Sequence, residues 1–487
     1  MKTIEQIFEQ AKVEDIIKDL TQKSIELPDW EDELKPQYEP FLHEIMVNKT
    51  KYPDKEIRRK EKSADGTAET EVLVRTEPIT RICIGLQKLA TKRISAFLFT
   101  IPVNSICEDI ESEEGKVDKV KEAQFYAVKK VLKKNKWNTL NKQRCKVISS
   151  ECEQATYWYT AEGEKENSYY GFKTKLSLKH SIFSPALGDS LYPLFDETGD
   201  MVAFSREYTA TDEENKKVTH FETWTSEKYH HWVKGESGWT EAEAKDNPIG
   251  KIPIVYSYRP KPIWDDGDNG KVEQIEKLLS KNGDILDYHA SPVLIIKGKL
   301  VGAPSKGEAN KVFFTEDGAG GAEYASWQQS PESTKFQFET LLRMFWQEIQ
   351  LPDLSYENVK GLGAPSGVAL KFLFSDAHLK CGDESEIYEA MLEREYNIIK
   401  AYLGAMNLSW RESINELEIE PEIRFFIIDD EKQRVEVLVA ANGGKPLVSQ
   451  KTATKLSGMV DNPDQEYALI EAEYAKENPS DIFEPSF

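Results

Sequence analysis

The chain has 487 residues, and its 63 lysine and arginine side chains against 85 aspartate and glutamate side chains give a formal net charge of −22. A chain of this length can bury a large core and is long enough for about two to four domains or subdomains. Proteins that bind nucleic acid tightly gain affinity by neutralising phosphates and are usually basic, so this charge argues against such a protein. It still allows a surface past which nucleic acid slides without adhering, because like charges repel.

Cysteine and histidine usage excludes further classes. The five cysteines and seven histidines show no zinc-site spacing and no disulfide framework, which predicts a reducing compartment. The N-terminal stretch is amphipathic and acidic, unlike a signal peptide. The most apolar helical candidate, residues 79–103, is interrupted by arginines and lysines. We therefore expect no membrane span and a soluble protein made inside the cell.

Helical patterns dominate the first 150 residues. Residues 1–62 are expected to form short helices with a basic end at Lys55–Lys62. Apolar spacing predicts a helix over Thr80–Phe99. Residues 116–136 predict a lysine-rich amphipathic helix, whose lysines we interpret as a solvated face, with docking of an acidic partner as the alternative. The side chains that this helix should bury are Phe125, Val128 and Leu132.

From residue 154 to residue 258 the pattern changes to short strands, in which aromatic and β-branched residues alternate with polar ones. This pattern predicts an antiparallel β region of about 100 residues. A metal site needs converging ligands that the pattern does not supply, so we interpret the histidines of this region as surface strand residues. They are His220, His230 and His231.

A turn-rich segment after the β region half-fits a calcium loop. Asp265, Asn269, Gly270 and Glu276 fall at suitable positions, but Gly267 offers no side-chain oxygen at the third position. Prolines just before the segment exclude the helix that enters an EF-hand loop. We therefore interpret the segment as a turn that caps the following helix.

The second half of the chain predicts two long helices around a strand-rich excursion. The first covers residues 271–289 and should be about 30 Å long. The second begins with a Ser330 cap and Pro331. A loop rich in glycine and proline follows Pro352, and an apolar helix is expected from Gly367. Further expected elements are a helix over 384–406 after a break at Gly382, a strand over 422–429, and polar helices over 431–476.

Several segments, taken in order, resemble the portal proteins of tailed double-stranded DNA phages. The segment AFLFTIPV ends the first long helix as "FLFG-x-PV" does in that family, although Thr100 replaces the usual glycine. Together the resembling segments cover most of residues 80–475. After AFLFTIPV they are residues 247–255, the helix from Pro331 with its "PD" pair and SGVALKFL, and residues 442–452 and 463–467.

The resemblance implies an α+β portal fold. This fold has a helical wing plus an antiparallel β region, a two-helix stem, a small α/β clip and a helical crown. The implied parts are a wing over 1–263 (helical 1–150, β-rich 151–260), a first stem helix over 264–290, a clip over 291–330, a second stem helix over 331–351, a tunnel loop over 352–366, wing helices and a strand over 367–428, and a crown with an acidic C-terminal tail over 429–487.

The resemblance also implies two sets of functional residues. The tunnel loop faces DNA, and its lone Lys360 either touches phosphate transiently or is simply solvated. The lysines of the clip either are scattered solvated residues or dock an acidic partner. The loop residues are Ser355, Tyr356, Glu357, Asn358, Val359, Lys360, Gly361, Leu362 and Gly363, and the clip residues are Lys297, Lys299, Lys306 and Lys311.

The implied function is a ring, typically of about twelve subunits, at one capsid vertex. Double-stranded DNA passes through such a ring during packaging and ejection, and a separate terminase pumps it. The expected partners are therefore other copies of the chain, DNA, the terminase, a head–tail adaptor, and the major capsid and scaffold proteins. The expected location is the virion, after synthesis in the host bacterial cytoplasm, with no cofactor and no membrane partner.

Catalytic motifs give little support to an enzyme. The chain contains no GxxxxGK[ST], HExxH or GxSxG sequence and no kinase motif set. Gly361–Gly367 mimics a dinucleotide-binding loop, but it follows a helix where that loop must follow a strand. We expect a non-enzymatic protein without catalytic residues. The alternatives are a nucleotide-dependent enzyme that uses this loop, and a head–neck adaptor without a channel.

Overall fold

The fold is given by a computed structural model, which divides into two compact units. One unit is Met1–Asp353 with Leu379–Phe425, and the other is Leu354–His378 with Phe426–Phe487. The structure describes residues 3–22, 25–62, 69–107, 110, 117–211, 215–265, 269–289, 293–297, 300–302, 314–315, 321–325, 331–353, 372, 374–426, 431–443, 447–457, 460 and 463–477.

The chain begins with short helices, as predicted, but the basic segment that follows them is a β-strand. The basic residues form β1 (Lys55–Lys62), which pairs antiparallel with β2 (Glu69–Glu77). The prediction that this basic segment is helical was wrong. Its lysines, arginines and glutamates favour a helix, but its pairing with β2 makes it a strand. The preceding elements are α1 (Ile4–Phe8), α2 (Val13–Leu20), η1 (Trp30–Leu34), α3 (Lys35–Tyr38), η2 (Pro40–Leu42) and α4 (Glu44–Val47).

The predicted antiparallel β region is confirmed as two sheets. The five-stranded sheet has the order β10-β9-β8-β7-β6, and the three-stranded sheet has the order β11-β4-β5. Apolar residues of both sheets, such as Phe183 and Trp224, form one core cluster, and α1 and α2 cover Phe221 and Trp232 of the larger sheet. The strands are β4 (Glu153–Asn167), β5 (Thr174–Phe183), β6 (Asp189–Phe195), β7 (Met201–Thr211), β8 (Lys217–Thr225), β9 (Lys228–Gly235), β10 (Gly238–Asp246) and β11 (Ile254–Tyr258).

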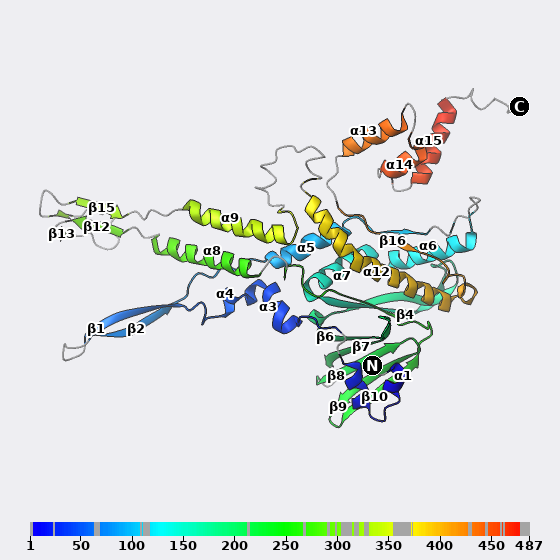
Figure 1. The fold of residues 1–487 in the computed structure, drawn as a ribbon, viewed down its shortest axis with the longest axis horizontal. Coiled ribbons are helices and arrows are strands. Elements are labelled where there is room, and N and C mark those ends of the chain that lie inside the picture. Colours follow the sequence, from blue (N-terminus) through cyan, green and yellow to red (C-terminus); the bar gives the residue numbers. More distant parts are fainter. Residues whose placement is uncertain are drawn as a thin grey trace. The chain divides into compact units, whose positions relative to one another are not determined.

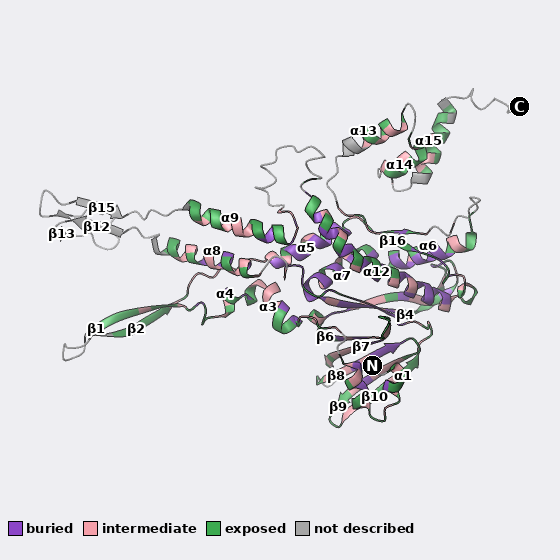
Figure 2. Cartoon of the chain, in the orientation of Figure 1, coloured by how far each residue is buried: buried purple, intermediate pink, exposed green. Residues whose placement is uncertain are grey.

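Helices pack around the smaller sheet, and Figure 2 shows buried residues concentrated where they meet. The lysine-rich helix is α6, and its Phe125, Val128 and Leu132 are buried as predicted. Strand β3 (Asn104–Ile106) pairs with β16 (Glu420–Glu422). The helices are α5 (Leu86–Phe99), α6 (Lys119–Lys134), α7 (Trp137–Glu151) and α12 (Ser375–Met406).

One fully buried carboxylate joins α12, α7 and β4. Glu395 of α12 accepts hydrogen bonds from the Arg144 guanidinium at 2.7 and 2.9 Å, and both residues are fully buried. It also accepts from the indole N–H groups of Trp137 at 2.6 Å and Trp158 at 3.0 Å. A buried charge is costly unless it is paired and hydrogen-bonded, and these four donors satisfy that condition.

Two boundary predictions in this region were wrong. The expected break at Gly382 is absent, since α12 runs through it as a single helix of 32 residues. An interior glycine costs a helix only about 1 kcal/mol relative to alanine, and the apolar residues that α12 buries on both sides outweigh that cost. The expected strand over 422–429 is shorter and earlier, at Glu420–Glu422, and its last residues lie outside the described part.

The two predicted long helices are confirmed as α8 (Asn269–His289) and α9 (Pro331–Glu348), which lie side by side in Figure 1. Short strands separate them in the sequence: β12 (Val293–Lys297), β13 (Leu300–Gly302), β14 (Phe314–Thr315) and β15 (Gly321–Ala325). The smaller unit contains the polar helices expected near the C-terminus, α13 (Glu431–Asn442), α14 (Gln450–Ser457) and α15 (Pro463–Glu477).

The architecture is thus a mixture of helices and antiparallel sheets, which is the α+β class predicted. None of the five cysteines, all of which lie in the described part of the chain, forms a disulfide with another. Among the residues that the structure describes, no helix is both long enough and apolar enough to cross a membrane.

Replacing the buried carboxylate tests its structural role. We expect Glu395→Gln to lower the free energy of unfolding by about 3–5 kcal/mol, because it leaves the Arg144 charge buried without a counter-charge. Urea unfolding followed by tryptophan fluorescence measures this loss. Glu389→Gln, at an exposed position of the same helix, is the control and should have little effect. Equal unfolding midpoints for the two variants would contradict the role assigned to Glu395.

Candidate functional site: the base of the paired helices

The predicted site residues lie mostly outside the described part of the chain. This holds for the whole predicted tunnel loop, Ser355–Gly363, and for Lys299, Lys306 and Lys311 of the predicted clip. Lys297 is described only as the last residue of β12. The structure does describe α8 and α9, which flank these segments in the sequence, and the contacts of both helices with the rest of the chain (called the body below).

The paired helices are buried at one end and exposed at the other. Near the body, Val272 and Ile275 of α8 and Phe345 of α9 are buried, and Lys271 forms an ion pair with Glu348. Further out, much of both helices is exposed (Figure 2), and apolar residues are among those exposed. The exposed fractions are 39% for Ile285, 49% for Leu286 and 70% for Phe336, and Met344, beside the buried Phe345, is 40% exposed.

An extended segment fastens α8 to the body by a ladder of three hydrogen bonds. The backbone N–H of Thr80 donates to Asp284 Oδ1 at 2.7 Å, that of Ile82 to Ser280 Oγ at 2.9 Å, and that of Ile84 to Glu276 Oε1 at 2.9 Å. Alternate amides of an extended chain repeat about every 6.6 Å, and every fourth helical residue repeats about every 6 Å. The two spacings match closely, so one segment can bond three successive turns of the helix.

This ladder explains why the helix predicted over Thr80–Phe99 begins only at Leu86. Amides that donate to α8 side chains are not available for helical hydrogen bonds, and the segment stays extended. A signal for this was present in the sequence. Pro78 and Gly85 bracket this stretch as turn and breaker residues, and within it Ile82 and Ile84 are spaced two apart, as in an extended chain.

The ladder ends at Glu276, which is almost completely buried and also binds His43. His43 Nδ1 lies 2.6 Å from Glu276 Oε1, and His43 Nε2 lies 2.8 Å from the backbone oxygen of Gln37. Each ring nitrogen of His43 is thus within hydrogen-bonding distance of an oxygen atom. Oε1 of Glu276 is therefore engaged in structural bonds with His43 and with the Ile84 amide.

A second carboxylate on the same helix face makes a similar attachment. The Tyr52 hydroxyl donates to Glu273, and Lys51 Nζ lies 2.6 Å from the same carboxylate. Burial and the Glu273 carboxylate raise the pKa of Tyr52, so this hydroxyl stays protonated and remains a donor. Although burial opposes it, the Lys51 and Tyr52 hydrogen bonds lower the pKa of Glu273. The start of α8 is thus held by charged and polar contacts on two sides.

The end of α9 is fixed by one arginine of α5. The Arg93 guanidinium stacks on the Trp346 ring at 3.8 Å from its centroid. It donates to the Pro352 backbone oxygen at 2.6 Å and to Asp353 Oδ1 at 3.4 Å. Burial lowers the pKa of Arg93 and the Asp353 carboxylate opposes that effect. These contacts fix the chain immediately before the predicted tunnel loop.

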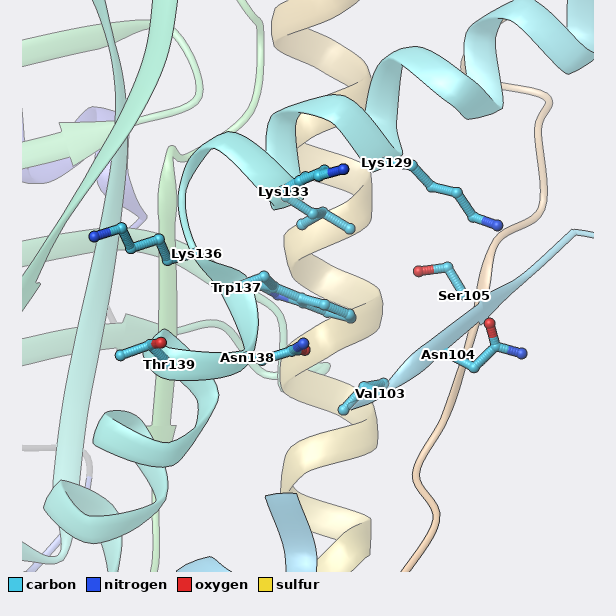
Figure 3. A pocket seen from close by; sticks show the side chains of 10 residues that line it. Val103, Asn104, Ser105, Lys129, Lys133, Lys136, Trp137, Asn138 and Thr139 are labelled. Atoms are coloured by element: carbon cyan, nitrogen blue, oxygen red, sulfur yellow. The ribbon is translucent and has the colours of Figure 1, made fainter. Parts of the chain in front are cut away.

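A basic groove lies between α6, the start of α7 and β3 (Figure 3). Its volume is about 400 Å³, and Lys129 and Lys133 extend from α6 along it. Ser105, on the β3 side, bonds the Tyr396 hydroxyl at 2.7 Å. Burial lowers the pKa of Lys129, whose Nζ lies 4.2 Å from the centre of the Phe125 ring. The alternative interpretation of α6 is that its lysines dock an acidic partner. The positive charge of this groove is what such docking requires.

Of the three histidines of the β region, His220 and His231 contact each other, whereas His230 lies on the opposite face of the sheet against Phe8 and Trp232. His220 Nδ1 lies 3.0 Å from His231 Nε2, and His230 Nδ1 lies 2.7 Å from Glu241 Oε1. Burial and the neighbouring His231 lower the pKa of His220. Within the described residues, no group of three or more histidine, cysteine, aspartate or glutamate side chains is arranged to hold a metal ion.

Comparison with known families gives the class of protein. Residues 32–480 match the family model described as "Phage portal protein, SPP1 Gp6-like". The match extends over most of the chain, and the chain belongs to this family of phage portal proteins. The family is a structural, non-enzymatic one.

Solved structures and curated proteins add less. A chain from the neck of an empty gene transfer agent particle, computed with C6 symmetry, is 14% identical with a TM-score of 0.35. A chain from the virion of a native gene transfer agent particle is 13% identical with a TM-score of 0.34. Each alignment covers 77% of this chain and 89% of the other. No curated protein matches.

Two glycines test how closely the extended segment approaches α8. A Cβ atom at Gly283 would lie 2.9 Å from Thr80 Cγ2, whereas one at Gly382 of α12 would meet nothing within 4 Å. Glycine to alanine normally stabilises a helix interior by about 1 kcal/mol. We therefore expect Gly382→Ala to raise the melting temperature and Gly283→Ala to lower it, as measured by circular dichroism.

Thr80, the other residue of this contact, provides the control. In the double variant Gly283→Ala, Thr80→Ser the clashing methyl group is removed, so we expect most of the lost stability to return. If Gly283→Ala stabilises as much as Gly382→Ala does, the close packing of Thr80 on α8 is refuted.

Proposed function

We propose that copies of this chain form a ring that serves as the DNA channel at one vertex of a phage capsid. On this proposal α8 and α9 are the stem, the short strands between them belong to the clip, and the segment after Asp353 is the tunnel loop. Residues 1–263 and 367–428 form the wing, and the C-terminal helices form the crown. Membership of the portal family supports the proposal.

One structural observation carries the stem assignment. Both long helices are held by the rest of the chain, α8 by the Thr80–Ile84 ladder along residues 276–284 and α9 by Arg93 near its end, while both also expose apolar side chains. Exposed apolar surface on a single copy typically marks an interaction site. In a head-to-tail ring the stems of neighbouring copies would cover it.

The charge of the chain suits transport. A net charge of −22 repels the phosphates of DNA, so DNA passing such a ring is not held by strong contacts. A terminase would supply the energy of packaging, and a head–tail adaptor would bind the ring after packaging. The predicted tunnel-loop and clip residues would make the DNA and adaptor contacts.

Assembly is the first test. We expect the purified chain to give ring-shaped negative-stain class averages with a central hole. Its native mass should be about twelve times the mass of one chain. Ring symmetry gives the subunit number directly. A monodisperse monomer in both measurements would refute the portal function.

The loop provides a separate test. Removing Glu357–Gly363 should leave ring formation unchanged, because the contacts of α8 and α9 with the body lie outside the deleted segment. The same rings should package or retain less DNA in an in vitro packaging reaction with the terminase. A deletion of matched length in the acidic C-terminal tail is the control. Loss of ring assembly in the loop deletion would show that the loop is a structural element instead.

A further inference from the structure

The β1–β2 hairpin is the least buried regular element near the stem. Figure 1 shows it extending outward beyond α4. Val72, Leu73 and Val74 are 44%, 50% and 58% exposed. A cleft of about 620 Å³, lined by Lys55 and Thr80 among others, separates the base of the hairpin from α8.

In the part of the chain that the structure describes, neither edge of this hairpin pairs with another strand. Its sheet has two strands only, and no third strand of the described chain bonds to either. A two-stranded hairpin is at best marginally stable in water unless a third strand or another element packs on it. Free edges also invite pairing with other chains. The hairpin therefore needs a partner outside its own copy.

The two strands carry opposite charge. By sequence, β1 has five basic and two acidic residues, a net charge of +3, and β2 has one basic and three acidic residues, a net charge of −2. Arg59 and Lys60 are exposed on β1, and Glu71 is exposed on β2. One side of the hairpin is thus basic and the other acidic, so the basic side of one hairpin complements the acidic side of another.

We infer that β1 of one copy pairs with β2 of the next copy, so that the hairpins contribute a continuous β seam to the ring. This inference rests on the proposed ring. Copies related by rotation point their hairpins the same way, so the new neighbours run antiparallel, like β1 and β2 themselves. Head-to-tail pairing of this kind repeats around a ring, and closure leaves no free edge. The partner is a second copy of this chain.

The experiment uses two charge variants of the full chain. In the acidic variant, Arg58→Glu, Arg59→Glu and Lys60→Glu make both strands negative. In the basic variant, Glu69→Lys and Glu71→Lys make both strands positive. Each variant alone places like charges across the seam, and we expect its yield of rings to fall about tenfold or more in negative stain and native mass measurements.

Mixing the two variants is the decisive step. An alternating ring puts an acidic strand beside a basic strand at every seam, so the equimolar mixture should recover rings in which both variants are present. Damage confined to each hairpin would not be repaired by mixing. Recovery therefore supports the seam, and failure to recover overturns it.

Two controls complete the design: the wild-type chain, and a variant with the same charge reversal at another place. Lys173→Glu, Lys175→Glu and Lys179→Glu place the same charge change on exposed residues on and beside β5, an edge strand of another sheet. Rings should persist in this variant, and an equal loss would assign the effect to net charge and overturn the inference. If the wild type forms no rings, the proposed function itself fails. If the wild type and both hairpin variants all form rings, only the seam is refuted.

Discussion

The match between two repeat distances determines how the long helix α8 is attached to the rest of the molecule. An extended chain presents an outward amide every second residue, a helix presents a side chain on one face every fourth residue, and the two intervals differ by less than an ångström. Thr80, Ile82 and Ile84 use this match to bind three successive turns of α8. Three bonds in a row fix both the direction of the helix and its rotation about its own axis, which a single contact cannot do.

The same stretch of chain also fixes the second helix. Residues 80–84 lead directly into α5, and Arg93 of α5 holds the end of α9. One continuous segment of 14 residues from Thr80 to Arg93 therefore sets the position of both long helices at their base. A displacement of α8 along the ladder would be transmitted through α5 to Pro352 and Asp353. The start of the predicted tunnel loop is in this way mechanically linked to the other helix of the pair.

Much of this fold follows from sequence patterns that record burial. The apolar spacing of α8 and α9, the alternation in the β region and the inward face of α6 all predict elements that the structure contains, since each pattern reflects one face packed on a core. The failures share a physical cause. At Thr80, Lys55–Lys62 and Gly382 the local sequence favours one conformation, and contacts with other elements impose another. The ladder was not predicted because its acceptors lie about 200 residues away from its donors.

The polar contacts of α8 differ in their exposure to solvent, which gives them different sensitivities to ionic strength. Glu276 is 1% exposed and its acceptor oxygen serves a backbone amide and a buried histidine, so dissolved ions have little access to these bonds. The ion pair of Lys51 with Glu273 is partly open to water, and salt screens such pairs over about 8–10 Å. A rise in salt would thus weaken the Lys51–Glu273 ion pair near the start of α8. The bonds of Glu276, three residues further along the helix, would keep their strength because they are shielded from dissolved ions.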